Sequence, residues 1–249
     1  MDKEIYEKIT AKKELSKLPK KDVEKAFAKF ENEDVSYEEK VRLTRELLNK
    51  IFWPFRSDKL LSIKDKDPEW ILRKHFSTRE RLHYYGELYN KILKQDCSII
   101  DLGAGINGFS YGFFPVKVDY VAVEGVGQLV DLMNYYFKKE KFKGRAYDFS
   151  LFELGKIKRL IKKTKKPRVI FLFKVLDNLE MIERDYSKKL LLEIVPLADQ
   201  VVVSFATQSI GGRTKFKVSR KWIFEFIDKE FKILDDFELG SEKYVVFSK

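Results

Sequence analysis

The chain has 249 residues, of which 44% are hydrophobic and 36% charged, a balance that excludes a disordered protein and allows a full α/β domain with a smaller appendage. Its formal net charge of +11 favours a polyanionic partner such as nucleic acid, because each neutralised phosphate releases condensed counterions. One cysteine cannot form an intramolecular disulfide, and with two histidines no metal site is expected. The apolar runs are too short to cross a bilayer and no secretory signal is found, so a cytoplasmic protein is expected.

The chain before residue 96 is predicted to be helical and contains almost no glycine. Apolar residues recur at helical spacing between charged ones in four segments. These predicted helices are 5–18, 20–30, 36–51 and 78–94. Ser36 followed by Glu39 forms a capping box at the head of the third helix. We therefore predict a helical domain over residues 1–72 and a second domain over residues 73–249, in which residues 73–96 form a linking helix.

Beyond residue 96, short apolar runs alternate with amphipathic segments. The predicted strands are 97–102, 118–123, 145–147, 169–173 and 200–205. The predicted helices between them are 108–114, 127–139, 151–163 and 179–195. This alternation predicts an α/β fold with a mostly parallel, doubly wound sheet. Two last strand-like runs, 231–239 and 243–248, flank Gly240 and predict a terminal antiparallel hairpin.

A glycine-rich turn, Asp101-Leu-Gly-Ala-Gly105, follows the first predicted strand. Glycines let the backbone pass close under a ligand and adopt dihedral angles that a side chain would forbid. We therefore expect Gly103, Ala104 and Gly105 to lie beneath a nucleotide-like cofactor, with Asp101 holding its amino group directly or through water. Glu124, at the end of the next strand, is placed to accept hydrogen bonds from ribose hydroxyls.

The identity of that cofactor is open on the glycines alone, because Gly103 to Gly108 also fits the pattern Gly-x-Gly-x-x-Gly of nicotinamide and flavin sites. Two features favour S-adenosylmethionine: an acid directly before the glycines would repel a pyrophosphate, and the sheet ends in a hairpin instead of further strand–helix units. Asp148, with Phe149 beside it after the third strand, can accept a hydrogen bond from the exocyclic amine of adenine. It can also cap the helix that follows.

Two basic segments could contact RNA. Eight Lys or Arg and no acid lie between Lys156 and Arg168, which indicates either a solvated helix face or a phosphate contact. Segment 204–216 leaves a buried strand and enters a polar loop in which paired glycines stand beside cations and aromatic residues, Phe205 among them. These residue types together favour a pocket for an extruded base and its phosphate.

Four motifs follow one another over residues 73–249. They are His75-Phe-Ser-Thr-Arg-Glu-Arg-Leu82, Asp101-Leu-Gly-Ala-Gly-Ile-Asn107, Phe173-Lys-Val-Leu-Asp-Asn-Leu-Glu180 and the segment from Ser204 to Lys215. In this order they resemble the motifs of the aminoglycoside-resistance 16S ribosomal RNA methyltransferases, which modify a guanine N7 in the decoding site. Residues 1–72 carry no such match.

The resemblance implies a Rossmann-like methyltransferase fold that binds S-adenosylmethionine, behind an N-terminal helical domain that docks on the small ribosomal subunit. It implies that Arg81 reaches the methionine carboxylate. It also implies that Arg213 and Lys215 approach the target nucleotide, with Ser204 and Phe205 in the same motif. The other motif residues assigned to the cofactor are Asn107, Phe173 and Lys174; His75 and Lys174 could equally be structural supports.

The sequence thus predicts a monomeric enzyme that methylates N7 of a guanine in 16S rRNA. This nitrogen carries an unshared electron pair and no proton at neutral pH, so in-line transfer requires no general base. The alternatives are a methyltransferase acting on transfer RNA or another ribosomal position, a ribosome-assembly factor that binds the cofactor without turnover, and a nicotinamide-dependent oxidoreductase.

Overall fold

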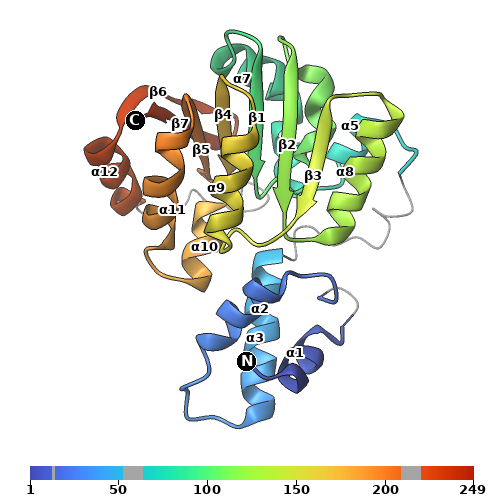
Figure 1. The fold of residues 1–249 in the computed structure, drawn as a ribbon, viewed down its shortest axis with the longest axis vertical. Helices are drawn as coiled ribbons and strands as arrows, with labels where there is room; N and C mark the ends of the chain where they lie inside the picture. Colours follow the sequence, from blue (N-terminus) through green and yellow to red (C-terminus); the bar gives the residue numbers. More distant parts are fainter. Residues whose placement is uncertain (13–14, 53–63, 209–219) are drawn as a thin grey trace.

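The computed structural model describes residues 1–12, 15–52, 64–208 and 220–249, which form a seven-stranded sheet with helices on both faces and a helical bundle at one end (Figure 1). The strand order is β3-β2-β1-β4-β5-β7-β6. The bounds are β1 Cys97–Leu102, β2 Val118–Glu124, β3 Gly144–Asp148, β4 Arg168–Phe173, β5 Gln200–Ala206, β6 Lys232–Leu239 and β7 Glu242–Ser248. Strands β1 to β5 run parallel, and β7 is antiparallel to both β5 and β6. The predicted α/β fold, with a mostly parallel sheet that ends in a hairpin, is confirmed.

The helices of the sheet domain divide between its two faces. One face carries α5 (Pro68–Leu72), α7 (Tyr85–Ile92), the 3₁₀ helix η3 (Asn107–Phe113) and α8 (Gly127–Lys139). The other carries α9 (Leu154–Lys163), α10 (Leu176–Ile182), α11 (Tyr186–Ile194) and α12 (Lys221–Glu230). Neighbouring residues of β1 enter opposite cores, Ile99 the first and Ile100 the second, because successive side chains of a strand point to opposite faces. The central strands are therefore apolar on both sides, as parallel strands usually are.

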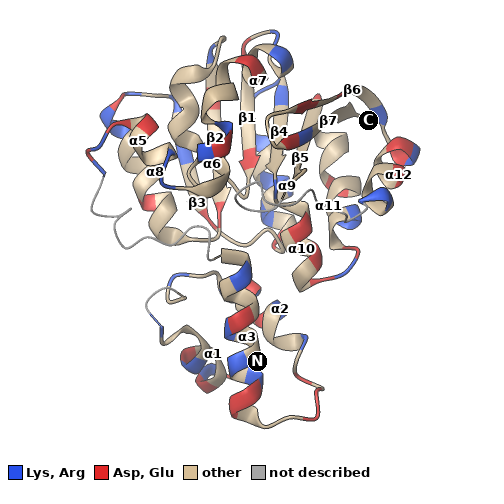
Figure 2. Ribbon diagram, turned by 180° about the vertical axis from the view of Figure 1, so that it is seen from behind, with Lys and Arg blue, Asp and Glu red and all other residues tan. Residues whose placement is uncertain are grey.

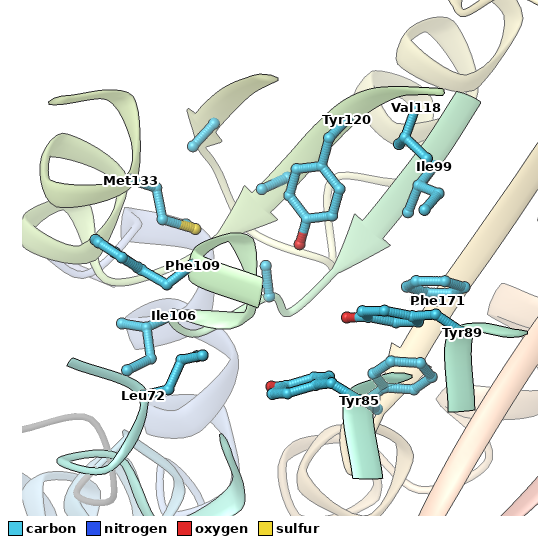
Figure 3. Close-up of a cluster of buried hydrophobic side chains, with 14 of the residues drawn as sticks. Leu72, Tyr85, Tyr89, Ile99, Ile106, Phe109, Val118, Tyr120, Met133 and Phe171 are labelled. Atoms are coloured by element: carbon cyan, nitrogen blue, oxygen red, sulfur yellow. The ribbon is translucent and has the colours of Figure 1, made fainter. Parts of the chain in front are cut away.

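An aromatic cluster fixes α7 and η3 against the sheet (Figure 3). The rings of Tyr85 and Tyr89 lie 5.4 Å apart between centroids, and Tyr89 stacks on Phe171 of β4 at 6.1 Å. Their hydroxyls are buried and satisfied: that of Tyr85 donates to Asn107 Oδ1 at 2.8 Å, and that of Tyr89 shares a hydrogen bond with Ser110 Oγ at 2.6 Å. Burial of these rings thus holds η3 beside the carboxyl end of β1.

The N-terminal bundle consists of α1 (Lys3–Thr10), α2 (Lys20–Ala28) and α3 (Tyr37–Phe52), packed around its own apolar core. Ser36 Oγ accepts a hydrogen bond from the backbone N–H of Glu39 at 3.2 Å, as the capping box predicts. The bundle contacts the sheet domain through α10, where Lys29 Nζ donates to the carbonyl of Met181 at 2.6 Å, and through Ile51, which enters the second core. It therefore abuts the carboxyl ends of the parallel strands (Figure 1).

Several predicted helices are shorter or broken. Segment 78–94 is divided into α6 (Phe76–Arg81), the 3₁₀ helix η2 (Leu82–Tyr84) and α7, which lets the side chains of Arg81 and Tyr85 reach Asn107 together. Segment 179–195 breaks at Asp185, whose φ of 61° is left-handed. Helix α1, the described helix within segment 5–18, ends at Thr10, and segment 108–114 lies mostly in the 3₁₀ helix η3.

The predicted domain boundary at residue 72 differs from the observed packing. Ile71 and Leu72 of α5 lie in the core that α7 and β1 share, so residues 68–72 pack with the sheet. The bundle itself comprises described residues up to Phe52. None of the described helices is long and apolar enough to cross a membrane.

Gly144 tests the packing of β3 against α8. A Cβ at this position would lie 2.6 Å from the ring of Phe137, which is buried, whereas a Cβ at Gly86 in α7 would meet nothing within 4 Å. We expect Gly144→Ala to lower the free energy of unfolding by about 1–3 kcal/mol through overpacking. Gly86→Ala should leave it unchanged or raise it by up to about 1 kcal/mol, because alanine favours the helix. Urea denaturation measures both, and equal effects of the two substitutions would contradict the packing described.

Candidate cofactor and active site

A pocket of about 240 Å³ lies at the carboxyl ends of β1, β2 and β4, where parallel sheets usually bind their ligands. Its walls come from the sheet, from α6 and α10, and from the N-terminal bundle. The residues predicted to bind a cofactor line it, except Asp148 and Phe149. The lining ones are Arg81, Asp101, Gly103, Ala104, Gly105, Asn107, Glu124, Phe173 and Lys174.

The glycine turn forms the floor of this pocket. Gly103 and Gly105 have φ values of 75° and 55°, which only glycine adopts readily, and a Cβ at Gly103 would approach Val175 to 2.6 Å. Glu124 fixes the turn from β2: one carboxylate oxygen accepts from the N–H of Gly105 at 2.8 Å and the other from Val126 at 2.9 Å. Burial raises the pKa of Glu124, and these backbone bonds oppose the rise. Its carboxylate thus shapes the turn and retains lone pairs for a ligand.

Arg81 is the centre of a buried polar network. Arg81 is 4% exposed, and its guanidinium binds both carboxylate oxygens of Glu242 in β7, at 2.9 and 2.8 Å. A further N–H donates to Asn107 Oδ1 at 3.0 Å. The pair is bidentate and fully enclosed, the geometry in which arginine–carboxylate bonds are strongest. The predicted contact of Arg81 with a methionine carboxylate stays a prediction, and Arg81 does line the pocket.

Asp101 joins this network through Asn107, whose amide donates to Asp101 Oδ2 at 2.7 Å. The hydroxyl of Tyr120 in β2 donates to the same oxygen. Burial raises the pKa of Asp101, and these two hydrogen bonds and the charge of Arg81 oppose the rise. Oδ2 of Asp101 thus accepts hydrogen bonds from Asn107 and Tyr120. Because Asp101 also lines the pocket, its carboxylate can still accept a hydrogen bond from the amino group of a ligand.

Lys174 and His75 flank Arg81. Lys174 directly follows β4 with a left-handed φ of 59°, and its ammonium lies 2.8 Å from Glu80 and 3.0 Å from Glu242. His75 Nδ1 accepts from the N–H of Thr78 at 3.4 Å and caps α6. Burial, with the nearby positive charges, lowers the pKa of His75 to about 3, so the imidazole is neutral. These contacts give both residues a structural role.

Of the four residues predicted to position the target nucleotide, two are buried in the structure and two lie outside the described residues. Phe205 is buried in the second core, where its ring contacts Phe224 at 5.2 Å between centroids, and the fully buried Ser204 lies on β5. Neither lines the pocket, whereas Ala206 and Gln208, which follow them, do. The predicted roles of Arg213 and Lys215 fall outside the described residues.

The predicted adenine contacts lie elsewhere. Asp148 is exposed and, with Phe149, borders a separate shallow depression formed with residues 17–21. In its place the pocket contains three residues of the bundle, Asp22, Ile51 and Phe52. These three residues could not be predicted as part of the site, because residues 1–72 carry no recognisable motif. Within the described ranges, no group of three or more His, Cys, Asp or Glu side chains is arranged to hold a metal ion.

Removing one partner of the buried Arg81–Glu242 pair should destabilise this region, because the other charge would be left uncompensated. Arg81→Ala leaves the buried Glu242 with Lys174 as its remaining charge partner, and we expect a loss of about 3 kcal/mol in the free energy of unfolding. The double substitution Arg81→Met with Glu242→Leu should recover most of that loss, since it removes both charges. Lys3→Ala, which breaks an exposed pair with Glu7, should change little. Urea denaturation tests these values; a small effect of Arg81→Ala would show that the pair does not hold the hairpin.

The same pair makes stability depend on pH. Burial alone would raise the pKa of Glu242, but the charges of Arg81 and Lys174 prevail and lower it to about 2. Because the unfolded value is about 4.3, the stabilisation from ionised Glu242 is complete above that pH and is lost as the pH falls through about 2. The stability difference between wild type and Glu242→Gln should therefore shrink as the pH falls below about 4. A difference that stays constant down to about pH 2 would be inconsistent with this shift.

Known proteins similar to this chain in sequence and in structure were compared with it. No protein-family model matches the chain. A 16S rRNA (guanine(1405)-N(7))-methyltransferase from Proteus mirabilis is 26% identical over 193 residues, which are 72% of this chain and 64% of that protein, so the chain spans less than two thirds of that relative.

Solved structures share the fold over nearly the whole chain. The 16S rRNA methyltransferase RmtF, in complex with S-adenosyl-L-homocysteine, superposes with a TM-score of 0.81 at 20% identity, covering 100% of this chain and 99% of that one. The 16S rRNA methylase RmtB gives 0.79 at 19% identity with 98% of each chain covered. An rRNA methylase from Escherichia coli gives 0.78 at 18% identity, covering 98% of this chain and 99% of that one. The predicted resemblance is confirmed: in sequence and in fold, the chain is similar to the 16S rRNA methyltransferases.

Proposed function

We propose that this protein is an S-adenosylmethionine-dependent methyltransferase that modifies N7 of a guanine in 16S rRNA. The observation that carries the proposal is the convergence of the glycine turn, Glu124 and Arg81 on one pocket at the carboxyl end of the sheet. The relatives' activities and the overall charge of +11 support the same function.

The residues of the pocket fit the proposed cofactor. Gly103 and Gly105 leave the backbone of the turn open to a close ligand, and Glu124 retains acceptors for ribose hydroxyls. Apolar side chains offer a surface for a flat base; they are Ile51, Phe52, Leu151, Leu179 and Ile182. Arg81 and Lys174 also line the pocket; Glu242 and Glu80 balance their charges, but the two side chains still offer N–H donors that suit a carboxylate. One pocket thus offers a place to each part of S-adenosylmethionine.

The protein's part in catalysis is positioning. S-adenosylmethionine supplies an electrophilic methyl group, and guanine N7 supplies its own electron pair. The chain has to hold the two reactants in line and exclude water, which can lower a barrier substantially without proton transfer. Ala206 and Gln208 line the pocket and precede the paired glycines Gly211 and Gly212 in the sequence, and an unstacked guanine is proposed to enter beside them. Arg213 and Lys215 are proposed to hold its phosphate.

Cations for RNA contact are spread over the molecule. Figure 2 shows Lys and Arg on both the bundle and the sheet domain, with acidic residues between them. On α9 the apolar Ile157 and Ile161 are buried against the sheet, and Lys162 and Lys163 are exposed. Arg168 of the same basic stretch is used internally, since it donates to the carbonyls of Thr164 and Leu197. We propose that the bundle and α9 bind RNA phosphates, and that a monomer acts on the small subunit in the cytoplasm.

Transfer of labelled methyl groups from S-adenosylmethionine tests the function. Small ribosomal subunits, free 16S rRNA and transfer RNA should be compared, with the modified nucleotide mapped. We expect label at N7 of one guanine in 16S rRNA. Arg213→Ala and Lys215→Ala should lower transfer at least about tenfold, because each removes a charge-assisted contact, and should leave cofactor affinity unchanged.

Each other outcome identifies an alternative. Label in transfer RNA or at another ribosomal position would indicate a different RNA substrate. Tight cofactor binding without label in any RNA would favour an assembly factor. Calorimetric preference for NAD over S-adenosylmethionine would favour an oxidoreductase. Full transfer by Arg213→Ala and Lys215→Ala would contradict the role given to that segment.

A further inference from the structure

The adenine end of the pocket lacks the carboxylate that the sequence placed there. Asp148 ends β3 but is exposed, and its Oδ2 lies beside Gly127, at 2.8 Å from where a Cβ of that glycine would stand. It is absent from the pocket lining. In a fold where the loop after β3 meets adenine, some other group must therefore recognise the base.

A carboxylate from the N-terminal bundle occupies this place. Asp22 of α2 lines the pocket beside Ile51 and Phe52 and is only 5% exposed. Ser150, in the loop that follows β3, lowers the pKa of Asp22 and so lies near its carboxyl group. Asp22 thus stands at the same loop from which Asp148 points away.

One oxygen of this carboxylate is unsatisfied. Asp22 Oδ2 is buried and has no hydrogen-bond partner among the described residues, and no ion pair joins Asp22 to a described Lys or Arg. Glu124, in the same pocket, adds a second negative charge. Burying an unpaired carboxylate is costly, and a protein retains one mainly where a ligand will satisfy it.

The raised pKa of Asp22 is consistent with a buried hydrogen-bond acceptor that has no donor in the ligand-free protein. Burial raises the pKa of Asp22 to about 7; the nearby hydroxyl of Ser150 opposes the rise, and the charge of Glu124 adds to it. Strongly shifted groups in a cleft often mark functional sites. A ligand that brings a hydrogen-bond donor to Oδ2 would compensate the buried charge.

The donor that matches this position is an amine on an aromatic base. Ribose hydroxyls are already matched by Glu124, at the end of β2. Apolar side chains line the same pocket as Asp22, among them Ile51 from the bundle and Leu151 from the sheet domain, and they fit a flat heterocycle. We propose that Asp22 accepts a hydrogen bond from the exocyclic amine of the adenine of S-adenosylmethionine, which makes the N-terminal bundle part of the cofactor site. This inference rests on the proposed function.

Contacts at the junction hold Asp22 in position. Lys25, one turn further along α2, lies 2.5 Å from Glu183 at the end of α10, and Lys29 bonds to the carbonyl of Met181. Lys17, just before α2, pairs with Asp131 of α8 at 3.1 Å. The bundle is thus attached on both sides of the pocket, and its placement and cofactor binding are coupled through Asp22.

Calorimetry with two ligands tests the proposal. The first is S-adenosylhomocysteine, and the second is its 6-deamino analogue, in which hydrogen replaces the exocyclic amine. Wild type should bind the first at least about tenfold more tightly, the difference expected for one hydrogen bond to a charged acceptor. Asp22→Ala should remove this preference by weakening only the adenosyl ligand. Asp22→Asn, which keeps a neutral acceptor, should retain an intermediate preference. Glu24→Ala, on the same helix with surface partners Lys20 and Lys21, should behave as wild type.

The outcomes separate the two proposals. Failure of wild type to bind either ligand would overturn the proposed function itself. Equal binding of both ligands by wild type would overturn the role of Asp22, and this comparison requires no variant to fold. A full tenfold preference in Asp22→Ala, or equal weakening of both ligands, would also overturn it. Thermal unfolding of the ligand-free variants provides a second readout: Asp22→Asn should be no less stable than wild type, because it removes an uncompensated buried charge.

Discussion

The buried ion pair between Arg81 and Glu242 is the constraint on which the site depends. It joins α6 to the terminal hairpin, and through Asn107 it reaches Asp101 at the end of β1. Each of these elements arrives from a different part of the chain, so the pocket exists only when the hairpin has paired with β5. An enclosed pair of this kind does little for stability compared with apolar packing, but it fixes geometry because no other arrangement satisfies both charges. The polar side of the pocket is thereby formed before any ligand arrives.

Local patterns were sufficient to predict the sheet and the glycine turn. Strand β1 is a fully buried, mostly apolar run that ends at a glycine-rich turn, and its bounds agree with the prediction because hydrophobicity and turn residues indicate the same strand. Glu124 could be assigned from its place at the end of the next strand, since neighbouring parallel strands bring their carboxyl ends together. The terminal hairpin could also be predicted, because the sequence has a glycine between two strand-like runs. In the structure this residue, Gly240, adopts the left-handed φ of 61° that a tight turn requires.

Tertiary contacts decided the rest. The helix predicted over 78–94 breaks because Arg81 and Tyr85 both turn towards Asn107, a demand that no local propensity reveals. Asp148 was placed in the pocket by its position after β3, yet the loop there admits Asp22 from a helix more than a hundred residues earlier in the chain. Phe205 was predicted to contact the target base because it is aromatic. In the structure it is buried in the second core, because successive side chains of β5 point to opposite faces of the sheet. In each case the deciding partner is distant in sequence.

We infer that a preformed pocket, shared between the bundle and the sheet, binds the cofactor without rearrangement of the Arg81 network. A crystal structure of the chain with S-adenosylhomocysteine would decide this. We expect the ligand along the Gly103–Gly105 turn, its ribose at Glu124 and its base beside Asp22, with the Arg81–Glu242 pair intact. A ligand whose base contacts Asp148, or a complex in which Arg81 has left Glu242, would contradict it.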